Sequence, residues 1–206
     1  MREPMEIRSS GLTHATAGLA LAVIWGSFAY RHINVFMLTG EWPYLVFFVS
    51  ETLQAGLFII RYQPVSVSRD PVDWTVAIAG TVAPLWFVPA ETGFGAHAGA
   101  LIVIGALLQI FGLVSLNRSF AIVAAKRKIR TSGMYRVVRH PIYASYLVLF
   151  SGYVWGNATA WNICLLSLIV ACIVVRVLRE ERHLGMDSTY RDYTRQVRFR
   201  LLPFLF

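Results

Sequence analysis

Long stretches almost without charge constrain this chain more than any other feature. They lie at residues 11–30, 43–60, 72–90, 98–116, 142–156 and 160–178. A membrane-crossing helix needs about 20 mostly apolar residues, so each stretch is a candidate span. Charged residues make up only 15% of the chain and apolar residues 56%, whereas soluble domains carry roughly 25% and 45–50%. The sequence therefore predicts an all-α fold, a polytopic integral membrane helix bundle of five to six spans.

The basic residues set the expected orientation. The net charge of +8 could suggest a nucleic-acid partner, but every one of the 19 Lys and Arg residues except Arg31 lies in four segments between the spans, beyond them or, for Arg176, at the end of the last one. Cytoplasmic loops of membrane proteins carry such an excess. We therefore expect no nucleic-acid binding, both termini in the cytoplasm, and a bacterial plasma (inner) membrane as the location. These segments are 1–10, 61–71, 117–140 and 176–206.

The organisation divides near residue 117. Residues 1–116 are expected to form N-terminal transmembrane helices, with residues 31–42 as a loop. Residues 117–206 hold a long basic loop, a helical hairpin turning at 157–159, and a short amphipathic C-terminal helix. Asp187 or Ser188 can cap that last helix, and Tyr190, Tyr193 and Val197 give it one apolar stripe.

The hairpin brings two distant polar clusters to one membrane boundary. Arg139 and His140 precede it, with Pro141 suited to the first turn of its first helix, and Glu180 and Glu181 follow it. A cation and a helix N-terminus attract a carboxylate, and either glutamate can hold an amine. The pattern therefore favours a site for a small zwitterionic ligand. The alternative is that these charged residues only anchor helix ends at the interface.

Two features of the expected spans bear on function and packing. Glu51 lies near the middle of the second span, beside Ser50 and Gln54. A carboxylate there is costly, which makes it a candidate functional residue, although a helix-packing role is the alternative.

The fourth span carries small residues suited to close helix packing, at Gly99, Gly105, Ala106 and Gly112. Cys164 and Cys172 lie in one apolar run and predict neither a disulfide nor a metal site.

Two motifs resemble a known family. The stretch GMYRVVRHPIY, residues 133–143, resembles the G-x-Y-x-x-x-R-H-P-x-Y signature of the isoprenylcysteine carboxyl methyltransferase family, shared in part with phospholipid N-methyltransferases. The tail EERHLGMDSTYRDYTRQVRFRLLP, residues 180–203, resembles that family's E-E-x-x-L…Y-x-x-Y-x-x-x-V…P ending. The likeness covers residues 116–203. R-H-P alone would be a weak signal, and the agreement of two distant motifs makes it specific.

This resemblance implies a membrane methyltransferase that uses S-adenosyl-L-methionine without a soluble nucleotide-binding domain and without a metal. It also implies that Arg139 orients the acceptor, and that Glu180 or Glu181 takes a proton if the acceptor is an amine, which makes Arg139 and Glu181 the catalytic candidates. The cofactor-binding candidates implied by the motifs are Tyr135, His140, Pro141, Tyr143 and Glu180.

The acceptor stays open between two chemistries. We expect a lipophilic small molecule or prenylated acceptor, with carboxyl methylation of an isoprenylcysteine favoured and amine methylation of a membrane phospholipid as the alternative. Two other classes compete. A membrane reductase would bind NADPH, although no nicotinamide motif is evident. A non-catalytic transporter or scaffold would use Glu51 and Gln109 to line a path, with the two charged clusters as anchors.

Overall fold

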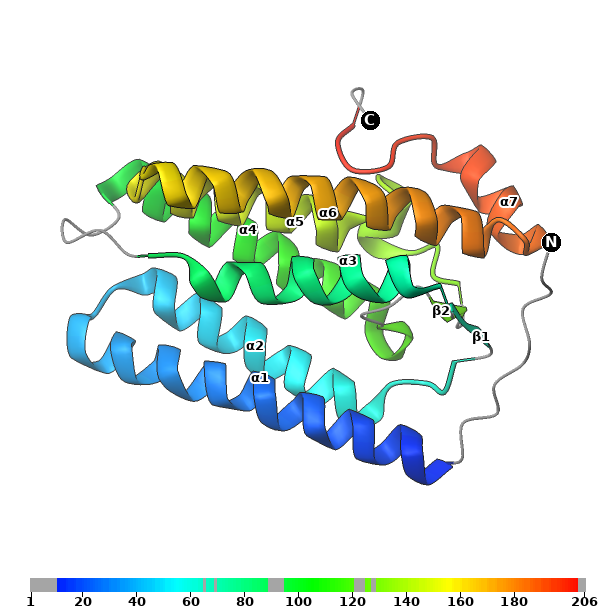
Figure 1. Ribbon diagram of the computed structural model, residues 1–206, viewed down its shortest axis with the longest axis horizontal. Coiled ribbons are helices and arrows are strands. Elements are labelled where there is room, and N and C mark those ends of the chain that lie inside the picture. Colours follow the sequence, from blue (N-terminus) through cyan, green and yellow to red (C-terminus); the bar gives the residue numbers. More distant parts are fainter. Residues whose placement is uncertain are drawn as a thin grey trace.

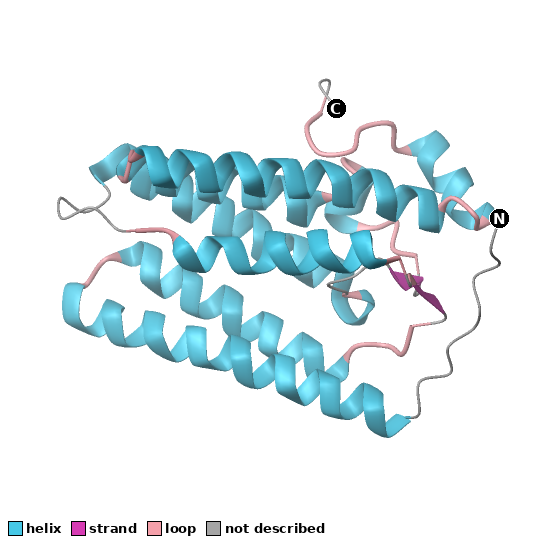
Figure 2. Ribbon diagram, in the orientation of Figure 1, coloured by secondary structure: helices cyan, strands magenta, loops and turns pink. Residues whose placement is uncertain are grey.

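The expected all-α bundle is confirmed (Figure 1). The computed structural model describes residues 11–64, 66–68, 70–88, 95–120, 125–126 and 129–203. Within these ranges helices dominate, and the single strand pair is two residues long on each side (Figure 2). The ten N-terminal residues, expected to form a cytoplasmic tail, lie outside the described ranges. The α-helices are α1 (Gly11–Thr39), α2 (Trp42–Ile60), α3 (Pro71–Val82), α4 (Gly95–Leu116), α5 (Pro141–Gly156), α6 (Ala160–Leu184) and α7 (Ser188–Gln196).

Three of the described helices are long and apolar enough to cross a membrane: Trp42–Ile60, Gly95–Ser119 and Ala160–Leu184. The short turn after α1, the turn between α5 and α6, and the end of α3 all lie at one end of the bundle (Figure 1). The strand pair β1 (Ser66–Val67) and β2 (Ala125–Lys126), which is antiparallel, lies at the other end with α7. The basic loops of the sequence therefore gather at that second end.

Two expected boundaries were wrong. Residues 31–42 were expected to form a loop, but α1 continues to Thr39, because the chain has no breaker before Gly40, whose φ of +70° ends the helix. The third span was expected to run from 72 to 90. Instead α3 ends at Val82 and tightens into a 3-10 helix, Ala83–Trp86. Pro84 has no backbone N–H to continue an α-helix.

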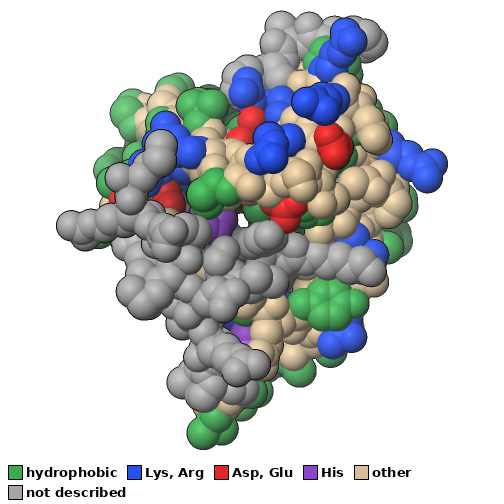
Figure 3. All heavy atoms as spheres, turned by 90° about the vertical axis from the view of Figure 1, so that its right-hand side faces the viewer, with side chains coloured by type: hydrophobic (Ala, Val, Ile, Leu, Met, Phe, Trp, Pro, Cys, Tyr) green, Lys and Arg blue, Asp and Glu red, His purple; other side chains and the backbone are tan. Residues whose placement is uncertain are grey.

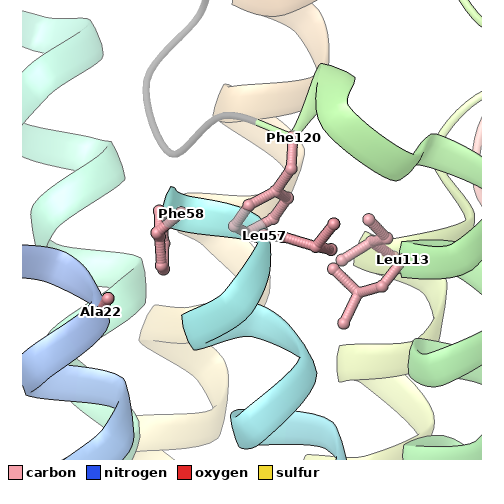
Figure 4. Close-up of a cluster of buried hydrophobic side chains, with 6 residues drawn as sticks. Ala22, Leu57, Phe58, Leu113 and Phe120 are labelled. Atoms are coloured by element: carbon pink, nitrogen blue, oxygen red, sulfur yellow. The ribbon is translucent and has the colours of Figure 1, made fainter. Parts of the chain in front are cut away.

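The tightest helix pair is α4 with α5, as the small residues of the fourth span predicted. A Cβ on Gly105 would lie 2.5 Å from the Leu149 backbone nitrogen, and one on Gly152 would lie 2.7 Å from the Leu101 Cβ. Only glycine allows such an approach between helices. Elsewhere α1, α2, α4 and α5 share a buried cluster around Phe58 (Figure 4). Its other members are Ala22, Leu57, Leu113, Ile142 and Phe120, the last of which follows α4 in the chain.

Helix α3 lies against α6 on the other side of the molecule. Arg179 of α6 forms ion pairs with Asp70 and Asp73 at the start of α3. A Cβ on Gly80 of α3 would lie 3.1 Å from the Cys172 Cβ of α6. Both cysteines are free. The fold thus holds α3 and α6 together on one side and α1 and α2 on the other, with α4 and α5 joining them (Figure 1).

Candidate active site

A large cavity lies between these helix groups, and we call it the chamber. Its volume is about 840 Å³, and residues from all seven α-helices line it. Ligand pockets in proteins usually measure about 300–1,000 Å³, so the chamber is large enough for a sizeable small molecule. Its walls are mainly apolar and aromatic along the spans. Charged and hydroxyl-bearing residues of the Arg-His-Pro motif, of α6 and of α7 also line it, as do several polar residues of α1 and α2.

The glycine that opens the motif is required by the local backbone. Gly133 has a φ of +62°, and a Cβ there would lie 2.4 Å from the Ser115 Oγ of α4. The same Ser115 hydroxyl accepts a hydrogen bond of 3.3 Å from the Met134 backbone N–H. The following 3-10 helix, Gly133–Arg136, buries Tyr135, whose carbonyl accepts a 2.8 Å hydrogen bond from the Tyr193 hydroxyl of α7. The motif thus docks on α4 and α7.

Glu181 forms ion pairs with Arg139, His140 and Arg200. We call this cluster of four residues the tail clasp. One carboxylate oxygen lies 2.9 Å from Arg139 Nη1 and 3.2 Å from His140 Nε2. The other oxygen accepts a 2.9 Å hydrogen bond from Arg200 Nε. The side chains of Glu181 and Arg139 are only 11% and 10% exposed. Buried charges that are paired in this way hold the neighbouring segments together.

The backbone of the C-terminal segment completes the tail clasp. The amides of Arg139 and His140 donate 2.9 Å hydrogen bonds to the carbonyls of Phe199 and Arg200. Arg139 Nη2 donates to the Arg198 carbonyl at 3.0 Å. His140 is the N-cap residue of α5, and Pro141 occupies its first turn as expected. The segment after α7 is therefore attached along the chain that enters α5. Figure 3 shows basic side chains gathered on this end of the molecule, over α6, α7 and the tail.

Glu180, one residue earlier in α6, has a different environment. It accepts a 3.0 Å hydrogen bond from the Tyr143 hydroxyl and lines the chamber. The Tyr143 ring stacks on His140, with ring centroids 5.7 Å apart, and the Arg176 guanidinium lies 4.9 Å from its centroid. This cation–aromatic contact orients the tyrosine. The Tyr143 hydroxyl therefore holds Glu180 with its carboxylate at the chamber wall.

Several residues that line the chamber carry a buried polar atom without a hydrogen-bond partner among the described residues; besides Ser50 and Arg130, two of them belong to the motif and to α7. The atoms of these two are Arg139 Nε and the Tyr190 hydroxyl. Leaving a buried donor unpaired costs about 1–3 kcal/mol, so such groups suggest a missing partner. Burial raises the pKa of Tyr190 and of Tyr193, and it raises that of Tyr135 well above the ordinary value. These hydroxyls are therefore protonated donors at neutral pH.

The predicted site residues separate into two groups. Five of them line the chamber together: Tyr135, Arg139, His140, Tyr143 and Glu180. Pro141 and Glu181 do not line it; Pro141 is buried at the start of α5, and Glu181 belongs to the tail clasp. Sequence reasoning did not include Tyr190, because its spacing in α7 was interpreted as an apolar stripe. That stripe is confirmed by the buried cluster of Tyr135, Tyr190, Tyr193 and Val197, but the unpaired hydroxyl depends on the fold.

Residues 95–192 match the family model described as phospholipid methyltransferase. The match begins with α4 and ends within α7, so it includes Glu180 and most of the tail clasp but not α1–α3 or Arg200. No curated protein matches the chain. The matched family and the family resembled by the motifs belong to one superfamily of membrane methyltransferases. The match therefore supports a membrane methyltransferase. It is equally consistent with methylation of an isoprenylcysteine and with methylation of a phospholipid.

Proposed function

We propose that this protein is an integral membrane methyltransferase that uses S-adenosyl-L-methionine to methylate a lipophilic acceptor. One observation carries the proposal. The same end of the chamber presents a carboxylate, Glu180, and an unpaired buried cationic N–H, Arg139 Nε. Opposite charges on the wall of one cavity complement the ammonium and carboxylate of an amino acid head group. The family match and the two motifs support the same class.

The residues present fit this cofactor. Glu180 would hold its ammonium group, while Arg139 Nε and the Tyr190 hydroxyl would hold its carboxylate, which gives both buried donors a partner. Tyr143, His140 and Tyr135 would line its binding site as the motif resemblance implies. When bound, the cofactor supplies a methyl group activated by a sulfonium centre. The apolar remainder of the chamber leaves room for the acceptor.

The contribution of the protein to this reaction is mainly positional. Holding two reactants in line can recover about 7–11 kcal/mol of the barrier. We assign Glu181 a positioning role, because both its oxygens are engaged by Arg139, His140 and Arg200. It keeps Arg139 aimed at the chamber. A carboxylate acceptor is already ionised and needs no base, whereas an amine acceptor must lose a proton. Glu180 is the motif carboxylate that lines the chamber and could accept that proton.

The acceptor enters from the bilayer in this proposal, and the tail clasp lies at the cytoplasmic boundary of a bacterial inner membrane, with both termini on that side. The positive charge of the loops supports this orientation. Isoprenylcysteine carboxyl methylation and phospholipid amine methylation remain the two acceptor chemistries. The family match favours neither over the other.

Calorimetric binding of S-adenosyl-L-methionine and its demethylated product tests the proposal in detergent-purified protein. We expect both to bind, NADPH not to bind, and Glu180→Ala and His140→Ala to abolish binding in protein that still unfolds cooperatively. Glu41→Ala, at an exposed glutamate between α1 and α2, is the matched control and should bind normally. Binding that survives in both site variants would overturn the residue assignment. Absence of binding in the folded wild type would favour the transporter hypothesis, with Glu51 and Gln109 lining its path.

A further inference from the structure

A second polar group lies in the chamber, in the part formed by α1 and α2. Glu51 Oε2 lies 2.7 Å from His32 Nδ1, and both residues line the cavity. The Glu51 side chain is 16% exposed. Its environment within the spans is apolar, where an ionisable side chain is costly to keep unless it has a function. Neither residue belongs to the segment that matches the phospholipid methyltransferase family.

Aromatic rings lie against the histidine of this pair and along the neighbouring chamber wall. The His32 ring stacks on Phe47 and on Tyr44, with centroids 5.0 and 6.1 Å apart. Trp25 and Phe28, from the preceding turns of α1, also line the chamber. The faces of aromatic rings attract cations, and a low dielectric strengthens the attraction. A carboxylate among aromatic rings is therefore an environment that selects a positively charged group.

Ser50 provides an independent sign of a missing ligand. Its side chain is 1% exposed, it lines the chamber, and its hydroxyl has no hydrogen-bond partner among the described residues. A buried hydroxyl without a partner costs about 1–3 kcal/mol, and a bound ligand would remove that cost. Ser50 immediately precedes Glu51 in α2. We call His32, Ser50 and Glu51 the inner polar site.

The inner polar site and the end of the chamber beside the Arg-His-Pro motif belong to one continuous cavity. Gln54, one turn beyond Glu51 in α2, accepts a 3.5 Å hydrogen bond from the Tyr146 hydroxyl of α5. Tyr146 lies one turn beyond Tyr143, which holds Glu180. All five of these side chains line the chamber. A lipophilic ligand in the chamber can therefore contact both ends.

We propose that the inner polar site binds the amine or ammonium group of a lipophilic ligand. Glu51 attracts such a group, whereas it repels a carboxylate brought into the same apolar cavity. The identification of this ligand with the methyl acceptor rests on the proposed function, and it would make the acceptor an amine-bearing amphiphile. Binding of the amine itself does not depend on that function.

Three ligands with one alkyl tail test the proposal: decylamine, decanoate and decanol. Each is titrated calorimetrically at pH 7 into detergent-solubilised protein, with a protein-free detergent blank. We expect the amine to bind at least about tenfold more tightly than the acid, since a charge-assisted hydrogen bond contributes this much. Equal affinities in the wild type would overturn the proposal without any variant. Tighter binding of decanoate would also overturn it and would implicate Arg31, an exposed chamber residue beside His32.

The variant Glu51→Gln should abolish the preference for decylamine, and Glu41→Gln should preserve it. A preference that persists in Glu51→Gln would contradict the assignment. S-adenosyl-L-methionine binding is measured on the same samples and should be unchanged in Glu51→Gln. If the amine preference is present in a wild type that fails to bind this cofactor, the methyltransferase proposal is wrong and the inner polar site remains. If the wild type binds S-adenosyl-L-methionine but shows no preference for decylamine, the inner polar site is rejected and the methyltransferase proposal stands.

Discussion

The tail clasp and the chamber contain similar polar residues in opposite situations. In the tail clasp, Glu181 has both oxygens engaged and Arg139 pairs through two of its nitrogens. In the chamber, Glu180 has one tyrosine partner and Ser50 has none among the described residues. Polar groups that satisfy each other stabilise a fold, whereas groups left facing a cavity are available to a ligand. The comparison separates two adjacent glutamates: Glu181 is engaged in ion pairs, and Glu180 lines the chamber, where a ligand could reach it.

The largest expected effect is the loss of stability in Glu181→Gln, compared with that in Glu180→Gln. Glu181→Gln removes the charge that compensates Arg139 and Arg200, and breaking a buried pair costs about 3–5 kcal/mol. Glu180→Gln keeps a carbonyl oxygen that can accept from the Tyr143 hydroxyl, so it should cost about 1 kcal/mol or less. The free energy of unfolding in detergent, measured by denaturant titration for both variants, checks this difference. Similar losses of unfolding free energy in the two variants would contradict the stabilising role of the tail clasp.

A smaller effect should follow from Gly133→Ala, which disturbs the motif loop between the two regions. The added methyl group would meet the Ser115 hydroxyl at a φ of +62°. Such a position costs about 1–3 kcal/mol with a side chain, and we expect a matching loss of stability together with weaker S-adenosyl-L-methionine binding. Gly56→Ala is the control, since a Cβ there would contact nothing within 4 Å. It should be neutral or slightly stabilising in the interior of α2. An equal response of the two variants would contradict the close docking of the loop.

The smallest effect concerns Asp70, an exposed residue. It caps α3, which lines the chamber, and pairs with Arg179 of α6. Hydrogen bonding to the Val72 N–H, followed by that to Arg179, lowers the pKa of Asp70. A carboxyl with a lowered folded-state pKa stabilises the protein above its unfolded pKa of about 3.9, and the contribution is lost as the pH falls through the lowered value. Asp70→Asn can still cap α3 but cannot titrate. Its melting temperature should approach that of the wild type as the pH falls from 6 to 3.

The matched control for that series is Asp192→Asn. Asp192 forms an ion pair with Arg195 at 3.1 Å on the exposed face of α7, where such pairs contribute little. Its melting temperature should follow the wild type across the same pH range. If Asp192→Asn and Asp70→Asn respond alike, the link between α3 and α6 has no particular role in the acid stability of the protein.

Several features could be predicted because they depend on neighbouring residues. Pro141 starts α5, the Asp187 side chain caps α7 by accepting from the Thr189 N–H, and residues 157–159 turn the chain between α5 and α6. Proline, capping side chains and turn residues act within a few positions of themselves. The role of Gly105 in helix packing was equally predictable, because small residues in an apolar span serve close approach.

The sequence by itself therefore determined an apolar helical bundle, its hairpin, and the gathering of the two motifs at one end. Only the tertiary structure decided that Glu181 joins Arg139 and Arg200 while Glu180 faces the chamber. It also decided that His32 pairs with Glu51 and that the Tyr190 hydroxyl lacks a partner among the described residues. These outcomes depend on how helices from distant parts of the chain rotate and pack. Residue spacing within one helix specifies a face, and the partner that meets this face is set by the packing of the whole bundle.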